Sequence, residues 1–145
     1  GYNGRGQLGT GEIYTKRNSL TTIPSLTNLT EEIGMIYTGS LGSYGHAVAL
    51  SDPAGPYPGR AWACGYDGDG QCGFGGKASA GRAKWSRIPF NKKIIDVRVW
   101  YGYGEGGGNT VVVSEDGELY ATGYGIYDIF SWNSSNRRYL SKISL

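Results

Sequence analysis

Gly1-Tyr-Asn-Gly-Arg-Gly-Gln-Leu-Gly-Thr-Gly11 recurs 64 residues later as Gly65-Tyr-Asp-Gly-Asp-Gly-Gln-Cys-Gly-Phe-Gly75, with its glycines in register. Glycines at fixed places in a short polar stretch are typical of tight turns, where the backbone adopts φ > 0 or approaches a neighbour closely. We therefore predict the same turn at both places. Its structural glycines are Gly6, Gly9, Gly70 and Gly73.

The repeat extends beyond the turns. Ile23-Pro24 matches Ile88-Pro89, and Gly45-His-Ala-Val-Ala-Leu-Ser51 matches Gly108-Asn-Thr-Val-Val-Val-Ser114, in the same order and at nearly the same spacing. Ordered matches at a nearly constant spacing indicate a tandem structural unit.

Each unit is predicted to hold short strands separated by loops. The expected strands are 33–38, 47–51 and 60–64 in the first unit, and 94–101, 110–114 and 118–122 in the second. Three or four short strands in about sixty residues is the spacing of a β-propeller blade. The sequence thus predicts an all-β fold made of tandem propeller blades.

We divide the chain into units of roughly 1–64 and 65–122, followed by a degenerate or partial unit at 123–145, all within a single propeller segment. The first residues have turn chemistry with nothing before them, so we expect the chain to begin inside a unit. Two blades cannot close a ring of four to eight. The propeller is therefore expected to be incomplete in this chain, with the remaining blades supplied by the same longer chain or by neighbouring subunits.

Composition narrows the classes of partner. The chain has 26 glycines, 39% hydrophobic residues and a net charge of +2, which argues against disorder and against collagen. The basic residues of the second unit form a local excess that we interpret as a solvated loop and edge strand: Lys77, Arg82, Lys84, Arg87, Lys92, Lys93 and Arg98. Nucleic acid is not expected as a partner, and no apolar run is long enough for a membrane span.

The repeated residues resemble the regulator-of-chromosome-condensation repeat. The resemblance lies in the pattern Gly-x-Asn-x-x-Gly-Gln-Leu-Gly-x-Gly, then Gly-His-Ala-x-Ala-Leu, then Asp-Gly-x-Leu-Tyr-x-x-Gly. It covers nearly the whole chain and implies a β-propeller, usually of seven blades. The sequence departs from the pattern where Leu8 becomes Cys72, where His46 becomes Asn109, and after Gly123. The resemblance implies a blade-stabilising role for His46 and its counterpart Asn109.

Motifs with enzymatic or cofactor chemistry have simpler structural interpretations. Gly4–Gly9, Gly68–Gly73 and Gly102–Gly107 match a dinucleotide fingerprint in spacing, but the required helix is not predicted after any of them. Asp67-Gly-Asp69-Gly resembles part of a calcium loop, yet no glutamate follows at the required distance, and a turn aspartate capping backbone amides fits better. No metal and no cofactor is expected.

The remaining reactive side chains are also read as structural. His46 is the only histidine, so any acid–base mechanism would depend on this residue alone. Cys64 and Cys72 are expected to pack as small apolar groups, with a local disulfide as the open alternative.

Loop surface is what is left for function. Glycine-rich loops at 40–45 and 103–108 occupy the same place in the two units, and the link 52–59 is longer than its counterpart. Tyrosines beside small residues are typical of recognition surfaces, although some of these rings could instead pack between blades. The candidate partner-binding residues are Leu41, Ser43, Tyr44, Tyr57, Tyr103 and Glu105.

We interpret the chain as a non-enzymatic binding or structural module. The family resemblance spans exchange factors for small GTPases, domains of ubiquitin ligases, a secreted bacterial enzyme inhibitor, and modules of cell-surface and bacteriophage tail proteins. The irregular units and glycine- and tyrosine-rich loops favour a virion tail or bacterial surface attachment assembly, located on a virion or outside the cell, with a protein or a surface glycan as partner. The alternative is a guanine-nucleotide exchange propeller or another regulatory propeller that binds a small GTPase.

Overall fold

The computed structural model describes the chain except residues 24–25, 27–31, 41–42, 102–106, 126–135 and 145. Its elements are strands, which form two four-stranded antiparallel sheets. The first sheet has the order β1 (Ile33–Gly39), β2 (His46–Ser51), β3 (Ala61–Asp67), β4 (Ala78–Arg87). The second has the order β5 (Ile94–Tyr101), β6 (Gly108–Ser114), β7 (Leu119–Gly123), β8 (Arg137–Lys142). The predicted all-β fold class is confirmed.

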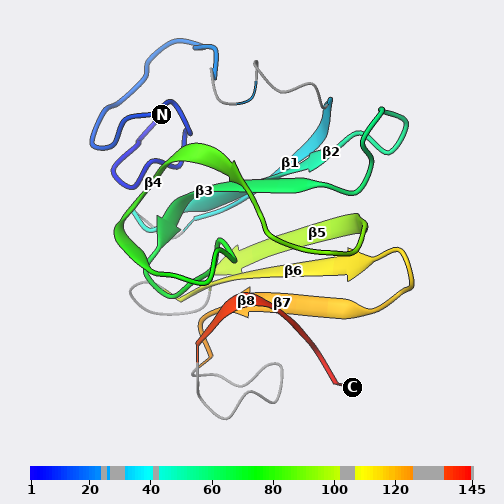
Figure 1. The fold of residues 1–145 in the computed structure, drawn as a ribbon. Coiled ribbons are helices and arrows are strands. Elements are labelled where there is room, and N and C mark those ends of the chain that lie inside the picture. Colours follow the sequence, from blue (N-terminus) through cyan, green and yellow to red (C-terminus); the bar gives the residue numbers. More distant parts are fainter. Residues whose placement is uncertain (24–25, 27–31, 41–42, 102–106, 126–135, 145) are drawn as a thin grey trace.

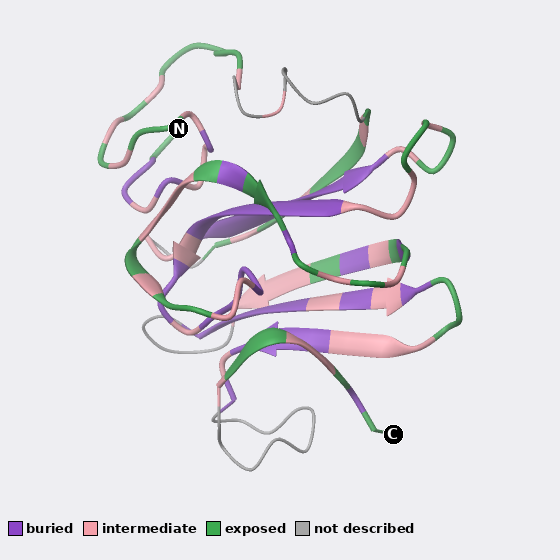
Figure 2. Ribbon diagram, viewed as in Figure 1, coloured by how far each residue is buried: buried purple, intermediate pink, exposed green. Residues whose placement is uncertain are grey.

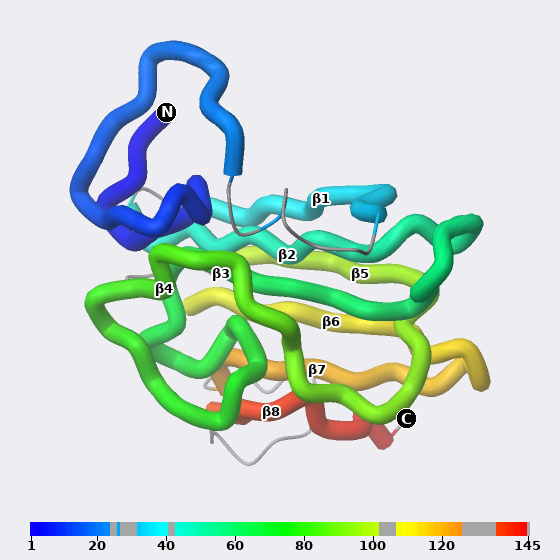
Figure 3. Tube along the Cα trace, turned by 45° about the horizontal axis from the view of Figure 1, so that its top comes forward, coloured from blue at the N-terminus to red at the C-terminus, as the bar shows by residue number. Residues whose placement is uncertain are grey.

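The two sheets stack face to face, as two blades of a propeller do (Figures 1 and 3). Edge strand β5 contacts β1 and β2 of the first sheet. Apolar side chains of both sheets fill the space between them: Val48, Leu50, Ala61 and Ala63 from the first, and Ile94, Val97 and Val112 from the second. Figure 2 shows that the buried positions are concentrated in the middle strands of the sheets. The core therefore lies at the seam between the blades.

The N-terminal segment covers the other face of the first sheet (Figure 1). There, Trp62 and Trp85 belong to a second buried cluster, against which Ile23 packs. Both faces of the first sheet are thus packed, which explains why β2 is buried along its whole length. In the part of the chain that the structure describes, no helix is long and apolar enough to cross a membrane.

The first three strands of each sheet lie where the sequence predicts them, but the fourth strands, β4 and β8, are corrections to that prediction. We expected a long loop after the glycine turn, because β4 begins Ala-Ser-Ala-Gly-Arg-Ala-Lys, a run poor in β-branched and aromatic residues. β4 is an exposed outer strand whose main contact is with β3. Apart from the buried Trp85, backbone pairing rather than side-chain pattern specifies β4, and backbone pairing also dominates in the largely exposed β8.

The sheets are phased differently from the sequence repeat. The repeat units were drawn at 1–64 and 65–122, whereas the sheets span 33–87 and 94–142. The glycine turn at 65–75 therefore lies inside the first sheet, between β3 and β4. The first sheet is completed by β4, which follows this turn.

Equivalent irregularities support the structural repeat. The register of β1 with β2 shifts between Ile33 and Met35, and that of β5 with β6 shifts between Ile94 and Asp96. The two sheets thus depart from regular pairing at matched places, as equivalent units of a repeat do.

Each glycine turn packs against the outer strand of the sheet beside it. In the first turn the amide of Gly11 donates to the carbonyl of Ala83 in β4 at 2.8 Å, and in the second the amide of Gly75 donates to that of Arg138 in β8 at 2.7 Å. A Cβ at Gly6 would lie 2.6 Å from Cα of Ala83. At Gly70 it would lie 2.8 Å from Cα of Arg138. The two turns thus make the same backbone contact with successive sheets.

We expect Gly70→Ala to destabilise the protein more than Gly117→Ala. Both glycines have positive φ, 87° and 78°, which costs an alanine about 1–2 kcal/mol. Only Gly70 is crowded, because no atom lies within 4 Å of a Cβ built at Gly117. Overpacking adds about 1–3 kcal/mol. Denaturant unfolding of the two variants measures the difference, and equal losses would show that the turn can move away from β8.

Candidate recognition surface

The glycine turns are held by their own polar side chains. Oδ1 of Asn3 accepts a hydrogen bond from the amide of Leu8 at 2.9 Å, and Oδ1 of Asp67 accepts one from the amide of Cys72 at 2.9 Å. The second carboxylate oxygen of Asp67 accepts from Nε of Arg82. One oxygen of this buried aspartate thus holds the turn, and the other binds strand β4. No group of three or more His, Cys, Asp or Glu side chains placed to hold a metal was found among the described residues.

Gly6, Gly9, Gly70 and Gly73 have φ values of 79°, 67°, 87° and 80°. Gly9 lies under the indole of Trp85, and Gly73 beside Ile88 and Thr122. These four glycines are therefore part of the packing between turn and sheet.

His46 links the two sheets. From β2 its Nδ1 lies 2.7 Å from the hydroxyl of Tyr101 in β5, and its Nε2 lies 2.7 Å from the hydroxyl of Thr110 in β6. The Thr110 hydroxyl donates in turn to the carbonyl of Gln71 at 2.8 Å. Burial lowers the pKa of His46 to about 3, so the imidazole is neutral at neutral pH. This arrangement ties β2 of the first sheet to β5 and β6 of the second, and it ties β6 back to the glycine turn 65–75 of the first sheet.

Asn109, the counterpart of His46 in β6, is also buried. Its Oδ1 has no hydrogen-bond partner among the residues that the structure describes. The sheet-to-sheet link made by His46 is therefore not repeated there by described residues.

The two cysteines are unpaired and buried. Sγ of Cys64 lies 3.6 Å from the carbonyl of Gln7, and Sγ of Cys72 lies 3.5 Å from that of Tyr66. Burial raises the pKa of both thiols. The structure thus holds them as small packed groups, and the disulfide alternative is not what it shows.

Of the six predicted partner-binding residues, the three that the structure describes lie at two opposite ends of the sheets. Leu41, Tyr103 and Glu105 lie outside the described residues. Ser43 and Tyr44 lie in the loop between β1 and β2, at the end of the sheets that also carries the glycine turn 67–77. Tyr57 lies in the link between β2 and β3, at the opposite end (Figures 1 and 3).

Tyr44 is packed rather than free. Its ring meets that of Tyr66 edge to face, with centroids 5.0 Å apart. The guanidinium of Arg5 lies 5.4 Å from the Tyr44 ring and 5.5 Å from the Tyr66 ring, and it donates to the carbonyl of Ser79 at 2.7 Å. This cluster joins the first glycine turn to the first sheet, so Tyr44 contributes to packing.

The end that carries Tyr57 has a cleft at the seam between the sheets. We call this end of the two sheets the link end. It consists of the links 52–60 and 88–93 and the turn 115–118. The cleft has a volume of about 490 Å³ and is walled by both links. Residues from its walls include Tyr57, Arg60, Arg87, Phe90, Lys92 and Lys93. It is the best candidate for a recognition surface in the described structure.

The cleft is basic. Arg60, Arg87, Lys92 and Lys93 line it, against the single acid Glu115. The Arg60 guanidinium lies 4.4 Å from the Tyr57 ring centroid, a cation–π contact. Arg87 and Lys93 are exposed, and the ammonium of Lys93 is 3.9 Å from the Glu115 carboxylate, a distance at which an exposed pair gains little. Positive charge therefore remains available along the cleft.

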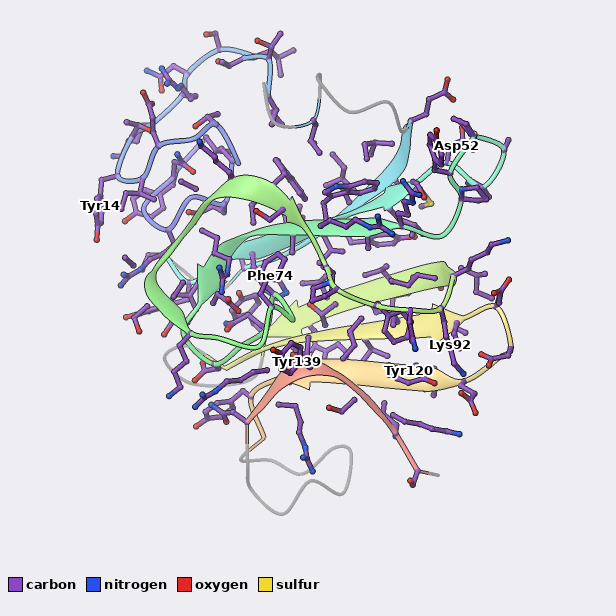
Figure 4. The ribbon with its side chains drawn as sticks, in the orientation of Figure 1. Tyr14, Asp52, Phe74, Lys92, Tyr120 and Tyr139 are labelled. Carbon is purple, nitrogen blue, oxygen red and sulfur yellow. The ribbon has the colours of Figure 1, made fainter. Side chains whose placement is uncertain are left out.

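Lys92 differs from its neighbours because it belongs to an ion-pair network. Its Nζ lies 2.5 Å from carboxylate oxygens of both Asp116 and Glu118, and it approaches the ring of Tyr120, as Figure 4 shows. Hydrogen bonds from Lys142 and Lys92 lower the pKa of Glu118 to about 2. Lys92 thus anchors the turn 115–118 more than it contributes free charge.

Sequence reasoning singled out Tyr57 but missed its neighbours. The sequence predicts Arg87, Lys92 and Lys93 in a solvated loop and edge strand, and Arg60 only as the start of a strand. The available signal was the run Asn91-Lys-Lys93 directly after an Ile-Pro-Phe link, repeated nowhere else in the chain. Nothing in the sequence showed that this link faces the inserted link at 52–60.

We expect stability to distinguish the two tyrosines. Tyr44→Ala removes a ring pair worth about 0.5–1.5 kcal/mol beyond its buried area, so its free energy of unfolding should fall by about 1–2 kcal/mol. Tyr57 is 42% exposed, and Tyr57→Ala should stay within about 0.5 kcal/mol of the parent. Thermal or denaturant unfolding tests this order. A larger loss for Tyr57→Ala would mean that the Tyr57 ring, and not the Tyr44 ring beside Arg5 and Tyr66, contributes to the packing of the fold.

His46 predicts a loss of stability in mild acid. Its pKa is about 3 in the folded protein and about 6.5 in an unfolded chain, so below pH 6.5 only the unfolded chain binds a proton there. Stability is therefore lost as pH falls, by roughly 2 kcal/mol between pH 6.5 and 5. Because His46 is the only histidine, His46→Asn should remove this loss. Unfolding of both proteins at pH 7 and pH 5 tests it, and an equal drop in both would contradict it.

Comparison with known proteins adds to this geometry. No family model matches the chain, and the search of curated proteins gave no match. Solved structures do match. Yeast RCC1 (Prp20), in a crystal structure of Kap60 bound to it, aligns with 100% of the chain at a TM-score of 0.70 and 17% identity. Human WBSCR16 aligns with 97% of the chain at a TM-score of 0.69 and 20% identity.

The chain spans 32% of the length of each of these two proteins. At this level of identity the likeness concerns the fold, and it agrees with the two antiparallel sheets and their repeated glycine turns. The chain therefore has the fold of two adjacent blades of an RCC1-type β-propeller.

Proposed function

We propose that this chain is a non-enzymatic part of a propeller that binds another protein through the link-end cleft. The observation that carries the proposal is the cleft of about 490 Å³ at the seam between the blades, lined by Tyr57 and Arg60. Tyrosine and arginine are among the residues that contribute most to binding at protein interfaces. The cleft walls are loops held by a packed scaffold, the usual location of binding residues.

Protein binding by another chain of this fold supports the proposal. The structure of yeast RCC1 (Prp20) is a complex with Kap60. It supports a protein partner in general and does not identify the partner of this chain.

The placement of the reactive side chains supports a non-enzymatic role. The imidazole of His46 is fully enclosed and bonded to Tyr101 and Thr110. The thiols of Cys64 and Cys72 are buried with raised pKa values, and a thiol in such surroundings is inert. These groups serve the packing of the blades.

The finer functional hypotheses rest on the sequence alone. Neither similar structure is described as part of a virion tail or bacterial surface, so attachment and a glycan partner have no support beyond loop composition. Exchange of guanine nucleotide on a small GTPase is not favoured either, because 17% and 20% identity support the fold and not an activity.

Site-specific crosslinking tests the proposed function. A photoreactive p-benzoylphenylalanine replaces Tyr57 in one protein and Tyr14 in a control. Tyr14 is 68% exposed and lies on the N-terminal segment, far from the link end in Figure 4. In extracts of the source cells, we expect a discrete protein adduct at position 57 that Arg87→Glu reduces at least fivefold. Absence of an adduct at 57, or equal adducts at 57 and 14, would contradict the proposal.

A further inference from the structure

A second, apolar cavity adjoins the basic cleft at the link end. It has a volume of about 160 Å³, and its lining includes Met35, Leu50, Pro53, Ile94 and Ile95. A dry apolar cavity of about 150 Å³ is large enough to bind benzene. This cavity therefore has room for one apolar side chain.

Exposed apolar side chains mark the entrance to the apolar cavity. Met35 is 54% exposed and Ile95 is 59% exposed, on the edge strands β1 and β5 that contact each other across the seam. Scattered exposed apolar residues are normal, but two at the mouth of an apolar cavity provide a surface that an apolar ligand group would cover.

The basic cleft and the apolar cavity share one wall, formed by Pro58, Gly59, Lys93, Ile94 and Glu115. Main-chain hydrogen bonds fix this wall, since the amide of Ile94 donates to the carbonyl of Gly59 at 3.0 Å and the amide of Glu115 donates to that of Lys93 at 2.9 Å. A ligand that spans both sites would find them at a set separation, which lowers the entropic cost of binding.

We propose that the link end binds an extended acidic peptide segment of a partner protein, with one apolar side chain in the apolar cavity and carboxylates in the basic cleft. This inference rests on the proposed function and specifies the chemistry of the partner. Charge complementarity selects an acidic ligand, because the exposed Arg87 and Lys93 line the cleft and Glu115 is the only acid in its lining. Lys92 is not counted, since it pairs with Asp116 and Glu118. The adjoining apolar cavity selects a peptide, whose side chains alternate in character, over a nucleic acid.

Fluorescence anisotropy with three labelled peptides tests the ligand. The first is Gly-Asp-Glu-Leu-Asp-Glu-Gly, the second has serine in place of leucine, and the third has lysine in place of each acid. We expect the full-length protein to bind the first peptide at 150 mM salt, the second at least fivefold more weakly, and the third not measurably. Equal binding of the first two peptides, or binding of the lysine peptide, would overturn the inference.

Variants of the protein locate the two halves of the site. Arg87→Glu should weaken binding of the leucine peptide at least fivefold. Lys84→Glu, the same charge change at an exposed position of β4 outside the cleft, should weaken it less than twofold. Ile95→Asp adds one negative charge, which should weaken binding of both peptides slightly. Its additional effect, loss of the apolar contact, should weaken binding of the leucine peptide only. Melting curves confirm that these surface variants fold, and equal effects of Arg87→Glu and Lys84→Glu would overturn the assignment to the cleft.

Two outcomes separate this inference from the proposed function. An adduct at position 57 without peptide binding would leave the protein-binding function standing and remove the acidic-peptide chemistry. Binding of a twelve-nucleotide oligothymidylate that depends on Arg87 and exceeds binding of the leucine peptide would also overturn the inference, because the ligand would then be a nucleic acid.

Discussion

The close contact between each glycine turn and the outer strand beside it is the constraint on which the rest of the structure depends. Gly6 touches the backbone of Ala83, and Gly70 touches that of Arg138, at separations that leave no room for a side chain. Since a turn of one unit thereby touches the strand that completes the following sheet, the contact sets the distance between blades. The apolar seam, the His46 bridge and the cleft at the link end all lie between the two blades, so each depends on that distance.

The sequence predicted the first three strands of each sheet well and the fourth poorly, for a physical reason. Strands such as β2 and β6 carry runs of apolar or β-branched side chains because they are packed on both faces. β4 and β8 are held mostly by backbone pairing at an outer edge, and their side chains are largely exposed. A weak signal existed in the match of Trp85-Ser-Arg-Ile88 with Leu140-Ser-Lys-Ile143, but it becomes recognisable only when the two strands are seen in equivalent places.

The candidate site shows the same division. Composition alone identified loops rich in tyrosine and glycine, but it could not say at which end of the sheets each loop lies. Tyr44 became part of a packed cluster with Arg5 and Tyr66, while Tyr57 met basic residues from another link. The proximity of these two links depends on the stacking of the two sheets, a long-range property that no local sequence pattern encodes.

The offset between the sequence repeat and the sheets bears on how such a chain can be divided. A boundary drawn at residue 65, where the repeated motif starts, cuts β3 and separates it from β4, its hydrogen-bonded neighbour in the same sheet. A boundary in the link 88–93 passes between complete sheets. Modular exchange of blades between proteins of this fold, by recombination or in the laboratory, would preserve intact units only at joints of the second kind, even though an alignment of repeats points to the first.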